Sequence, residues 1–170
     1  GKTTFITKYI TGRFNNNKSS TLGASFFTHD IKIDNEEHML EIWDTAGQER
    51  YRSLAPMYYR SADAALLFFD LSNLNSYQSI NYWKQELSLT KNPNLIQIIV
   101  GNKLDLVDKE TINFSLKKHF LISSKENIDV VKLIETAAKE VIKIKNKKIE
   151  ENKILLSQIK NKSIKKSKCC

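Results

Sequence analysis

Apolar stretches of strand length alternate along the chain with segments in which apolar residues recur every three or four positions. This alternation predicts strands and helices in turn, joined by short loops. Strands are expected near Ser25–Ile33, Met39–Trp43, Ala64–Phe69, Leu95–Val100 and His119–Ser123, and helices near Thr3–Gly12, Tyr51–Arg60, Ser76–Lys91 and from Ile128 to about Lys148.

Such an alternation is typical of an α/β domain with a mostly parallel sheet and helices on both faces. The first two strands, joined at Asp34-Asn35, are expected to form an antiparallel hairpin at its edge. The 170 residues have room for one such domain, which we place at residues 1–148. Residues 149–170 contain few large apolar side chains, so we expect a flexible tail. A short coiled coil is the alternative, with Ile149, Ile154, Leu155 and Ile159 as its apolar positions.

Positive charge gathers in this C-terminal region. The formal net charge is +8, and residues 139–170 hold eleven lysines against three glutamates, whereas opposite charges balance over residues 1–138. Because the basic residues are not spread over a domain face, this pattern argues against nucleic-acid binding. The longest purely apolar run, Ala64–Phe69, is too short to cross a bilayer. We therefore expect no nucleic-acid partner and no membrane-spanning helix.

The chain opens with Gly1-Lys2-Thr3-Thr4, which matches the second half of the phosphate-binding pattern G-x-x-x-x-G-K-[ST]. In that pattern backbone N–H groups surround phosphates, and the lysine reaches the outer ones. Lys2 and Thr3 are therefore candidate phosphate-binding residues. A Gly-Lys-Thr triplet by itself is more often without function.

The second motif, Asp-Thr-Ala-Gly-Gln at residues 44–48, follows an apolar strand. Asp44 at the carboxyl end of that strand is suited to hold Mg²⁺, mainly through water. Gly47 has no side chain to keep its N–H from a terminal phosphate, and Gln48 is placed to orient an attacking water. An acidic strand end followed by a glycine turn is the structural alternative.

The third motif, residues 102–105, also follows an apolar strand. The Asp105 carboxylate can accept two hydrogen bonds from the N1–H and N2–H₂ edge of guanine, whereas adenine offers neither donor there. Asn102 is expected to brace the loops and Lys103 to cover one face of the base. In the later segment Ser123-Ser124-Lys125, the Ser124 N–H is expected to reach the guanine oxygen.

These motifs occur in a fixed order, each at the carboxyl end of an expected strand, where open parallel sheets bind nucleotides. Together they resemble the Ras superfamily of small GTPases, whose fold is that of the P-loop NTPases. The segments Leu22–Phe26, Glu41–Tyr51, Tyr58–Ala62 and Leu67–Ser72 resemble those that set its Rab branch apart, over about residues 1–142 in all. The run Arg50–Arg60 is most similar to Rabs of early endosomes.

The resemblance implies a role for individual residues. Gln48 and Lys2 would be catalytic, and Mg²⁺ would be held by Thr3, Thr21 and Asp44. Phe14 would lie against the guanine, although a surface aromatic is the alternative. Phe26, Trp43 and Tyr58 would form an aromatic triad for effectors, where the residues alone suggest core packing. The nucleotide-binding set would be Gly1, Lys2, Thr3, Thr4, Phe14, Thr21, Gly47, Asn102, Lys103, Asp105, Ser123, Ser124 and Lys125.

Two departures from the family pattern stand out. The strand and the first half of the phosphate loop, expected before Gly1, are missing, which would leave a gap in the middle of the sheet. We expect an incomplete gene model or a trimmed chain. The segment Leu106–Lys118 is several residues shorter than in Rabs, so the helix before the last strand should have only one or two turns.

Cys169 and Cys170 end the sequence, and their pairing resembles the Rab signal for double geranylgeranylation. Two lipids, aided by nearby lysines, would anchor the chain to a membrane. The alternative is that the lysines form a solvated charged segment and that the two cysteines have no function. With no cysteine elsewhere, a reducing cytosolic compartment is expected.

The sequence thus predicts a switch that binds GTP and GDP with Mg²⁺, hydrolyses GTP slowly and regulates vesicle trafficking. It would be a monomer on the cytoplasmic face of early endosomes, cycling with the cytosol. Its partners would be effectors, an exchange factor, a GTPase-activating protein, a prenylation escort and a GDP-dissociation inhibitor. A binding module that no longer cycles is the first alternative, and a nucleic-acid-binding protein acting through the tail is a weaker one.

Overall fold

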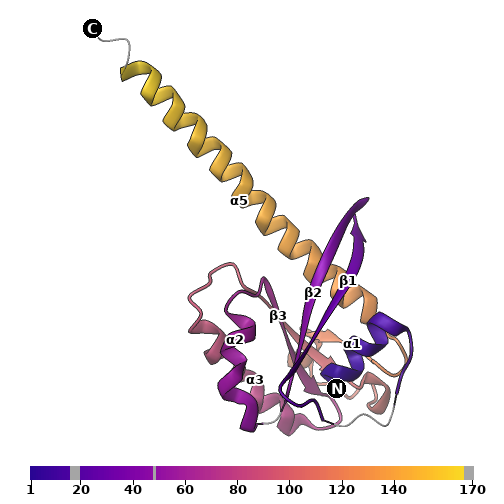
Figure 1. Cartoon of the computed structure of the whole chain (residues 1–170). Helices are drawn as coiled ribbons and strands as arrows, with labels where there is room; N and C mark the ends of the chain where they lie inside the picture. Colours follow the sequence, from indigo (N-terminus) through magenta and orange to yellow (C-terminus); the bar gives the residue numbers. More distant parts are fainter. Residues whose placement is uncertain (16–19, 48, 167–170) are drawn as a thin grey trace.

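A computed structural model describes residues 1–15, 20–47 and 49–166 of the chain (Figure 1). Helices and strands alternate as expected from the sequence. In chain order the elements are α1 (Lys2–Thr11), β1 (Ala24–Ile33), β2 (Glu36–Thr45), the 3₁₀ helix η1 (Glu49–Leu54), α2 (Ala55–Tyr59), β3 (Ala64–Asp70), η2 (Leu74–Tyr77), α3 (Gln78–Ser88), β4 (Ile96–Asn102), η3 (Leu104–Leu106), α4 (Phe114–Lys117), β5 (Phe120–Leu121) and α5 (Val130–Lys166).

The hairpin of β1 and β2 is antiparallel, with Ala24 opposite Thr45 and Ile33 opposite Glu36. Asp34 and Asn35 at its tip have φ angles of 50° and 71°. Two successive positive φ angles give a two-residue turn whose twist matches that of the strands, and Asp and Asn tolerate this conformation better than most residues. The hairpin predicted from Asp34-Asn35 is therefore confirmed, but it forms a two-stranded sheet of its own and not the edge of the parallel sheet.

A second, parallel sheet has the order β3-β4-β5. Among the described residues β2 and β3 belong to different sheets, so the predicted gap in the sheet is present. The facing edges of β2 and β3 therefore do not pair with each other.

Alternate residues of β3 supply the two halves of the core. Leu67 and Phe69 pack with Ile80 and Leu116 on one face, whereas Leu66 and Phe68 contact the cluster around Phe5 on the other. A fully buried parallel strand shows this pattern because successive side chains point to opposite faces.

Helices α1 and α5 cover the second face and bridge the two sheets. The cluster formed by Phe5, Val100 and Leu133 also takes up Phe27 and Ile42 from the hairpin. The Phe5 and Phe68 ring centroids are 5.1 Å apart. This shared core fixes the hairpin beside the parallel sheet, although no ladder of hydrogen bonds joins them.

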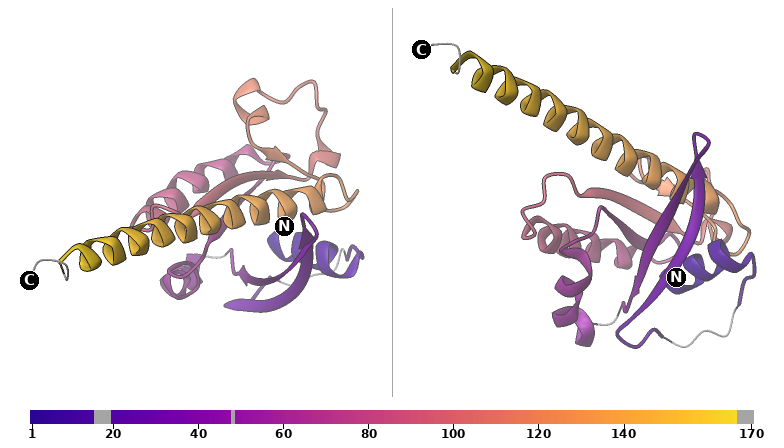
Figure 2. Two further views of the ribbon diagram at one scale, coloured as in Figure 1. Left: turned by 90° about the horizontal axis from the view of Figure 1, so that it is seen from above. Right: turned by 45° about the horizontal axis from the view of Figure 1, so that its top comes forward.

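The last strand is shorter than predicted, since β5 spans only Phe120–Leu121, and the boundaries of three helices were wrong. The expected helices at Tyr51–Arg60 and Ser76–Lys91 begin as 3₁₀ turns, η1 and η2. The last helix continues to Lys166 instead of ending near Lys148, and its second half projects from the body (Figures 1 and 2). The shortening of the helix before the last strand is confirmed, since α4 spans only Phe114–Lys117.

Candidate functional site

The first group of site residues lies where the start of α1 meets the end of β2. The Thr3 hydroxyl donates to Asp44 Oδ2 at 2.6 Å, and the Thr21 hydroxyl donates to the same oxygen at 3.3 Å. The two hydroxyl oxygens are 2.6 Å apart. Three oxygen-bearing side chains, from a helix, a loop and a strand, thus meet at one point, as the magnesium assignment requires.

Only 1% of the surface of Asp44 is exposed, yet its Oδ1 atom has no hydrogen-bond partner among the described residues. A buried carboxylate oxygen without a partner is costly, and a cation or a cation-bound water would satisfy it. Carboxylate and hydroxyl oxygens are the donors that Mg²⁺ prefers. The described residues contain no group of three or more His, Cys, Asp or Glu side chains that could hold a metal ion.

Lys2 lies next to Gly47. A Cβ atom added to Gly47 would be 3.1 Å from Lys2 Nζ, so the missing side chain makes room for the ammonium group. Burial lowers the pKa of the Lys2 amine, and the nearby Asp44 carboxylate opposes this effect. A buried amine with a lowered pKa gains most from an anionic ligand, since such a ligand restores the charged form.

Gly1 connects the phosphate motif to the third motif. A Cβ atom at Gly1 would be 2.7 Å from Asn102 Nδ2, a distance that only glycine permits. Asn102 is buried, and its Oδ1 accepts hydrogen bonds from the backbone N–H of Lys103 and from the N–H and hydroxyl of Ser124. Asn102 therefore holds three segments of the chain together.

The Ser124 N–H, expected at the guanine oxygen, donates instead to Asn102 Oδ1 at 3.1 Å. Asp105 lies beside the same loop, because the Ser123 hydroxyl donates to its Oδ1. One carboxylate oxygen of Asp105 is thus fixed by Ser123, which orients the side chain that was assigned to the base. Lys125 is exposed and lies 3.9 Å from Glu126.

Sequence reasoning missed Asp70 at the carboxyl end of β3. Lys103 Nζ lies 2.6 Å from Asp70 Oδ2, while the Ser72 N–H and hydroxyl donate to Oδ1. Burial alone would raise the pKa of Asp70, but these bonds outweigh it and hold the pKa below its ordinary value. Asp70 could have been found by the same signal as Asp44, an aspartate directly after an apolar strand.

The three aromatic residues assigned to effectors form a continuous cluster. The ring centroids of Phe26 and Trp43 are 4.8 Å apart, and those of Trp43 and Tyr58 are 5.1 Å apart. Phe26 and Trp43 are each 47% exposed, so they are surface residues and not core. The interpretation as core packing, which the residues alone favoured, was wrong for these two side chains.

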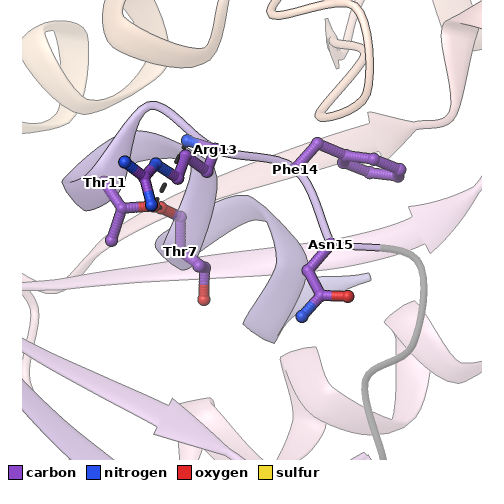
Figure 3. Close-up of a pocket in the computed structure, with 5 residues that line it drawn as sticks. All are labelled: Thr7, Thr11, Arg13, Phe14 and Asn15. Carbon is purple, nitrogen blue, oxygen red and sulfur yellow. Dashed lines mark hydrogen bonds between the residues drawn. The ribbon is translucent and has the colours of Figure 1, made fainter.

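Phe14 is half-buried in the loop after α1 and lines a hollow of about 510 Å³ with Thr7, Thr11, Arg13 and Asn15 (Figure 3). In the close-up its ring points away from Thr7 and Arg13. No residue of the phosphate or magnesium group lines this hollow. Thr4 lies in α1, half-buried, whereas Gln48, Cys169 and Cys170 lie outside the described residues.

The contacts together place the assigned residues along one connected edge. Asp44 touches Thr3, Lys2 lies by Gly47, Gly1 lies against Asn102, and Asn102 is bonded to the loop that orients Asp105. This edge follows the carboxyl ends of β2, β3 and β4. The fold is that of a P-loop nucleotide-binding α/β protein.

Comparison with known proteins gives the family. The model of the Ras family matches residues 1–155, and the chain belongs to this family of small GTPases, in its Rab branch. The resemblance noted in the sequence is thereby confirmed. Members of the family bind GTP and GDP with Mg²⁺.

Three plant proteins illustrate the similarity. The Ras-related protein Rab5 of Nicotiana tabacum is 44% identical over 112 residues, which cover 66% of this chain and 56% of the relative. Rab5A of Oryza sativa subsp. japonica is 40% identical over 144 residues, 85% of this chain and 68% of the relative. RABF2a of Arabidopsis thaliana is 38% identical over 146 residues, 86% and 70% respectively. The chain thus spans between about half and about two thirds of their length.

Proposed function

We propose that this chain is the nucleotide-binding part of a molecular switch that binds GTP and GDP and hydrolyses GTP. The observation that carries the proposal is the connected edge on which Lys2, Asp44 and Asp105 lie. These residues come from three distant parts of the sequence, yet contacts through Thr3, Gly1 and Asn102 link them.

At one end of this edge, Asp105 is proposed to select guanine. Ser123 bonds one of its carboxylate oxygens and fixes the side chain, so the group is preorganised to accept the N–H donors of the base. Adenine would leave the half-buried Asp105 acceptor unsatisfied and is expected to bind weakly. Lys103, held by Asp70, is proposed to cover the base with its aliphatic stem.

At the other end, Thr3, Thr21 and Asp44 are proposed to hold Mg²⁺. When bound, the cation supplies positive charge that stabilises the transferring phosphoryl group. Lys2 would neutralise the outer phosphate oxygens, and Gly47 would bring its N–H to the terminal phosphate. Gln48 is proposed to orient the attacking water.

The contact of Thr21 with Asp44 supports a mechanism for switching. Thr21 belongs to the loop before β1, and its hydroxyl lies 2.6 Å from the Thr3 hydroxyl and 3.3 Å from Asp44 Oδ2. Loss of the terminal phosphate would weaken the proposed contact of Thr21 with Mg²⁺, and the loop would then be free to move. Because β1 carries Phe26, a change in the loop would reach the aromatic triad, the proposed effector surface.

The relatives named Rab5 support a role in endocytic vesicle trafficking at early endosomes, with double geranylgeranylation of Cys169 and Cys170 as the anchor. No described helix is both long and apolar enough to pass through a membrane. Effectors, an exchange factor, a GTPase-activating protein, a prenylation escort and a GDP-dissociation inhibitor are the proposed partners. No arginine is assigned to the reaction, so rapid hydrolysis would need the activating protein.

A binding module that no longer cycles is the second candidate. The gap between β2 and β3 favours it, because these two strands belong to separate sheets among the described residues. Such a module would bind GDP and GTP weakly and without a dependence on Mg²⁺.

The dissociation of a fluorescent GDP analogue, with Mg²⁺ and with a chelator, tests the proposal. Chelation should accelerate release from the wild-type chain and have little effect on Asp44→Asn, because that variant lacks the carboxylate charge while keeping its size. Asp30→Asn, an exposed residue of β1, is the matched control. Equal release rates with and without Mg²⁺ in the wild type would favour the non-cycling module.

A further inference from the structure

The outer edge of β4 is open over the first half of the strand. On one side β4 pairs with β3 along its whole length, from Ile96 to Asn102. On the other side β5 pairs only with Val100 and Gly101, so among the described residues no strand lies beside residues 96–99 there. An open strand edge presents backbone N–H and C=O groups that can pair with another chain.

The hydrogen bonds of β4 show which backbone groups point to this open edge. The Ile96 N–H donates to the carbonyl of Asp63 on the β3 side at 3.0 Å, whereas the Gly101 carbonyl accepts from the Ile122 N–H on the β5 side at 2.8 Å. Successive residues of a parallel strand bond to opposite neighbours, so the N–H and C=O of Gln97 point to the open side, like those of Gly101. Outside the strand ladders, no hydrogen bond among the described residues involves Gln97.

The side chain of Gln97 lies on the face of the sheet that α3 covers. Leu95 and Ile99, at alternate positions on either side of it, pack against the cluster of Ile80 and Leu116 on this face. Gln97 itself is exposed, so the single turn of α4 does not cover it. An approaching segment therefore has access both to the backbone edge and to this face.

Two lysines border this surface without an acidic partner. Lys84 of α3 lies seven residues after Tyr77, about two helical turns, so both are on the same side of the helix. The Tyr77 hydroxyl lies 2.9 Å from His119 Nε2. Burial lowers the pKa of His119, and the positive charges of Lys118 and Lys84 lower it further. Both lysines are exposed, and no ion pair among the described residues involves either of them.

The lysines and the open edge belong to one surface, because His119 directly precedes Phe120, the β5 partner of Val100. Two exposed positive charges without carboxylate partners favour an anionic ligand. The open edge favours a ligand with an extended backbone. An extended peptide with acidic residues at alternate positions has both properties, since alternate side chains of a strand share one face.

We propose that the open edge of β4 binds an acidic peptide segment of a partner protein, which adds as a strand beside residues 96–99 and pairs its carboxylates with Lys84 and Lys118. This surface contains neither the nucleotide-binding residues nor the aromatic triad, so the proposal goes beyond the proposed switch. A second copy of the chain fits less well, because its own edge carries the same lysines. Nucleic acid would use the lysines but leave the backbone groups of Gln97 unpaired.

Fluorescence anisotropy of the full chain with a labelled peptide that alternates glutamate and valine tests this proposal. The peptide should bind less tightly as salt is raised, and its affinity should fall at least about tenfold when lysine replaces the glutamates. Lys84→Glu should weaken binding of the glutamate peptide about tenfold, because it reverses one charge of the pair. Lys32→Glu, which changes an exposed lysine of β1, is the matched control and should have little effect.

Gln97→Pro tests the part of the backbone. Proline removes the N–H that points to the open side and keeps the ladder with β3, a position at which strands tolerate it. The variant should keep the urea unfolding midpoint of the wild type and lose about tenfold in peptide affinity. In the wild type, hydrogen exchange of the Gln97 amide should slow when the glutamate peptide is bound. This exchange measurement and Lys84→Glu decide the matter if Gln97→Pro does not fold.

The proposal is overturned if the glutamate and lysine peptides bind equally or if Lys84→Glu binds the glutamate peptide as the wild type does. Peptide binding that leaves exchange at Gln97 unchanged would reject strand addition. Self-association or RNA binding through Lys84 and Lys118, with no binding of the glutamate peptide, would assign this surface to a different occupant and overturn the proposal as well.

Discussion

Gly47 leaves space for the ammonium group of Lys2. Its backbone has no positive φ angle to maintain, so the advantage of glycine here comes from space and not from conformation. The nearest atom to an added Cβ is Lys2 Nζ, at 3.1 Å, which is closer than most side-chain contacts. A larger residue would therefore displace the ammonium group that is proposed to meet the outer phosphates.

Gly47→Ala is accordingly expected to lower the rate of GTP hydrolysis by roughly ten- to a hundredfold, because a small misplacement of a catalytic group is costly. Single-turnover measurements give the rate. The urea unfolding midpoint should stay unchanged, since Gly47 is exposed. A hydrolysis rate equal to that of the wild type would show that Lys2 and Gly47 do not share one site.

Asp70 provides a test that depends on pH. Because its pKa is held below the ordinary value of 3.8, the carboxylate stabilises the fold fully above that value, and the contribution is lost as the pH falls through the lowered pKa. Asp70→Asn should therefore lower the unfolding free energy by about 1 kcal/mol at neutral pH and by progressively less in acid below pH 4.

Urea unfolding of Asp70→Asn between pH 7 and pH 3 measures this difference, with the exposed Asp30→Asn as control. Lys103→Gln should show a similar loss, because it removes the other half of the same pair. A deficit that stays constant down to pH 3 would mean that the ion pair does not stabilise the folded state.

The elements of the fold were largely readable from the apolar pattern. The strand β3 and the hairpin turn were predicted nearly to the residue, because an apolar run and two turn-forming residues leave few alternatives. The 3₁₀ turns at η1 and η2 were not predicted, since helical periodicity does not distinguish a tight turn from an α-helix over four to six residues.

Site residues with a motif were easier to predict than contacts between them. The positions of Thr3 and Asp44 follow from strand ends and spacing, so their meeting was expected. The pairing of Lys103 with Asp70 joins two strand ends that no motif connects. The use of the Ser124 N–H by Asn102 depends on loop geometry, which the sequence pattern does not determine.

The helical structure of residues 146–166 was not predicted from the sequence, for a physical reason. Its sequence lacks core-forming residues, which favoured a flexible tail. A helix needs backbone hydrogen bonds and residues with adequate propensity, and lysine and glutamate have it. The lack of apolar residues for a core therefore does not show that a lysine-rich segment is not helical.

The short helix α4 retains a role in the core despite its single turn. Leu116 and the preceding Ile112 are buried against Leu67 and Phe69. Leu116→Ala is expected to lower the unfolding free energy by about 2 to 4 kcal/mol, because it leaves a cavity beneath the parallel sheet. Urea denaturation measures this value, and Lys117→Ala, which changes an exposed neighbour, should have little effect. If Leu116→Ala lowers the unfolding free energy by less than about 1 kcal/mol, α4 does not have this role in the core.

The division into two sheets is the main feature of the molecule as a whole. The facing edges of β2 and β3 do not pair, and the shared core under α1 and α5 holds the sheets beside each other. Unpaired strand edges and incomplete core packing lower stability. A strand inserted between them would also place the first half of a phosphate loop next to Lys2.

Fusing an apolar strand followed by G-x-x-x-x to Gly1 is therefore expected to raise the unfolding free energy by roughly 2 kcal/mol or more and to strengthen GDP binding. Urea unfolding and fluorescent-GDP titration measure both effects. A control strand with serine at its apolar positions should have neither effect. If the apolar strand changes neither the unfolding free energy nor the GDP affinity, it does not fill the gap between β2 and β3.

The most direct test of the connected edge is a titration of this extended chain with GTP, GDP, ATP and XTP in the presence of Mg²⁺. We predict that GTP and GDP bind at least about 10⁴-fold more tightly than ATP, since adenine leaves the acceptor at Asp105 unpaired. In Asp105→Asn, whose amide can donate to the extra carbonyl of xanthine, the preference should move from GTP to XTP. Equal affinity for ATP and GTP in the wild type would contradict the account.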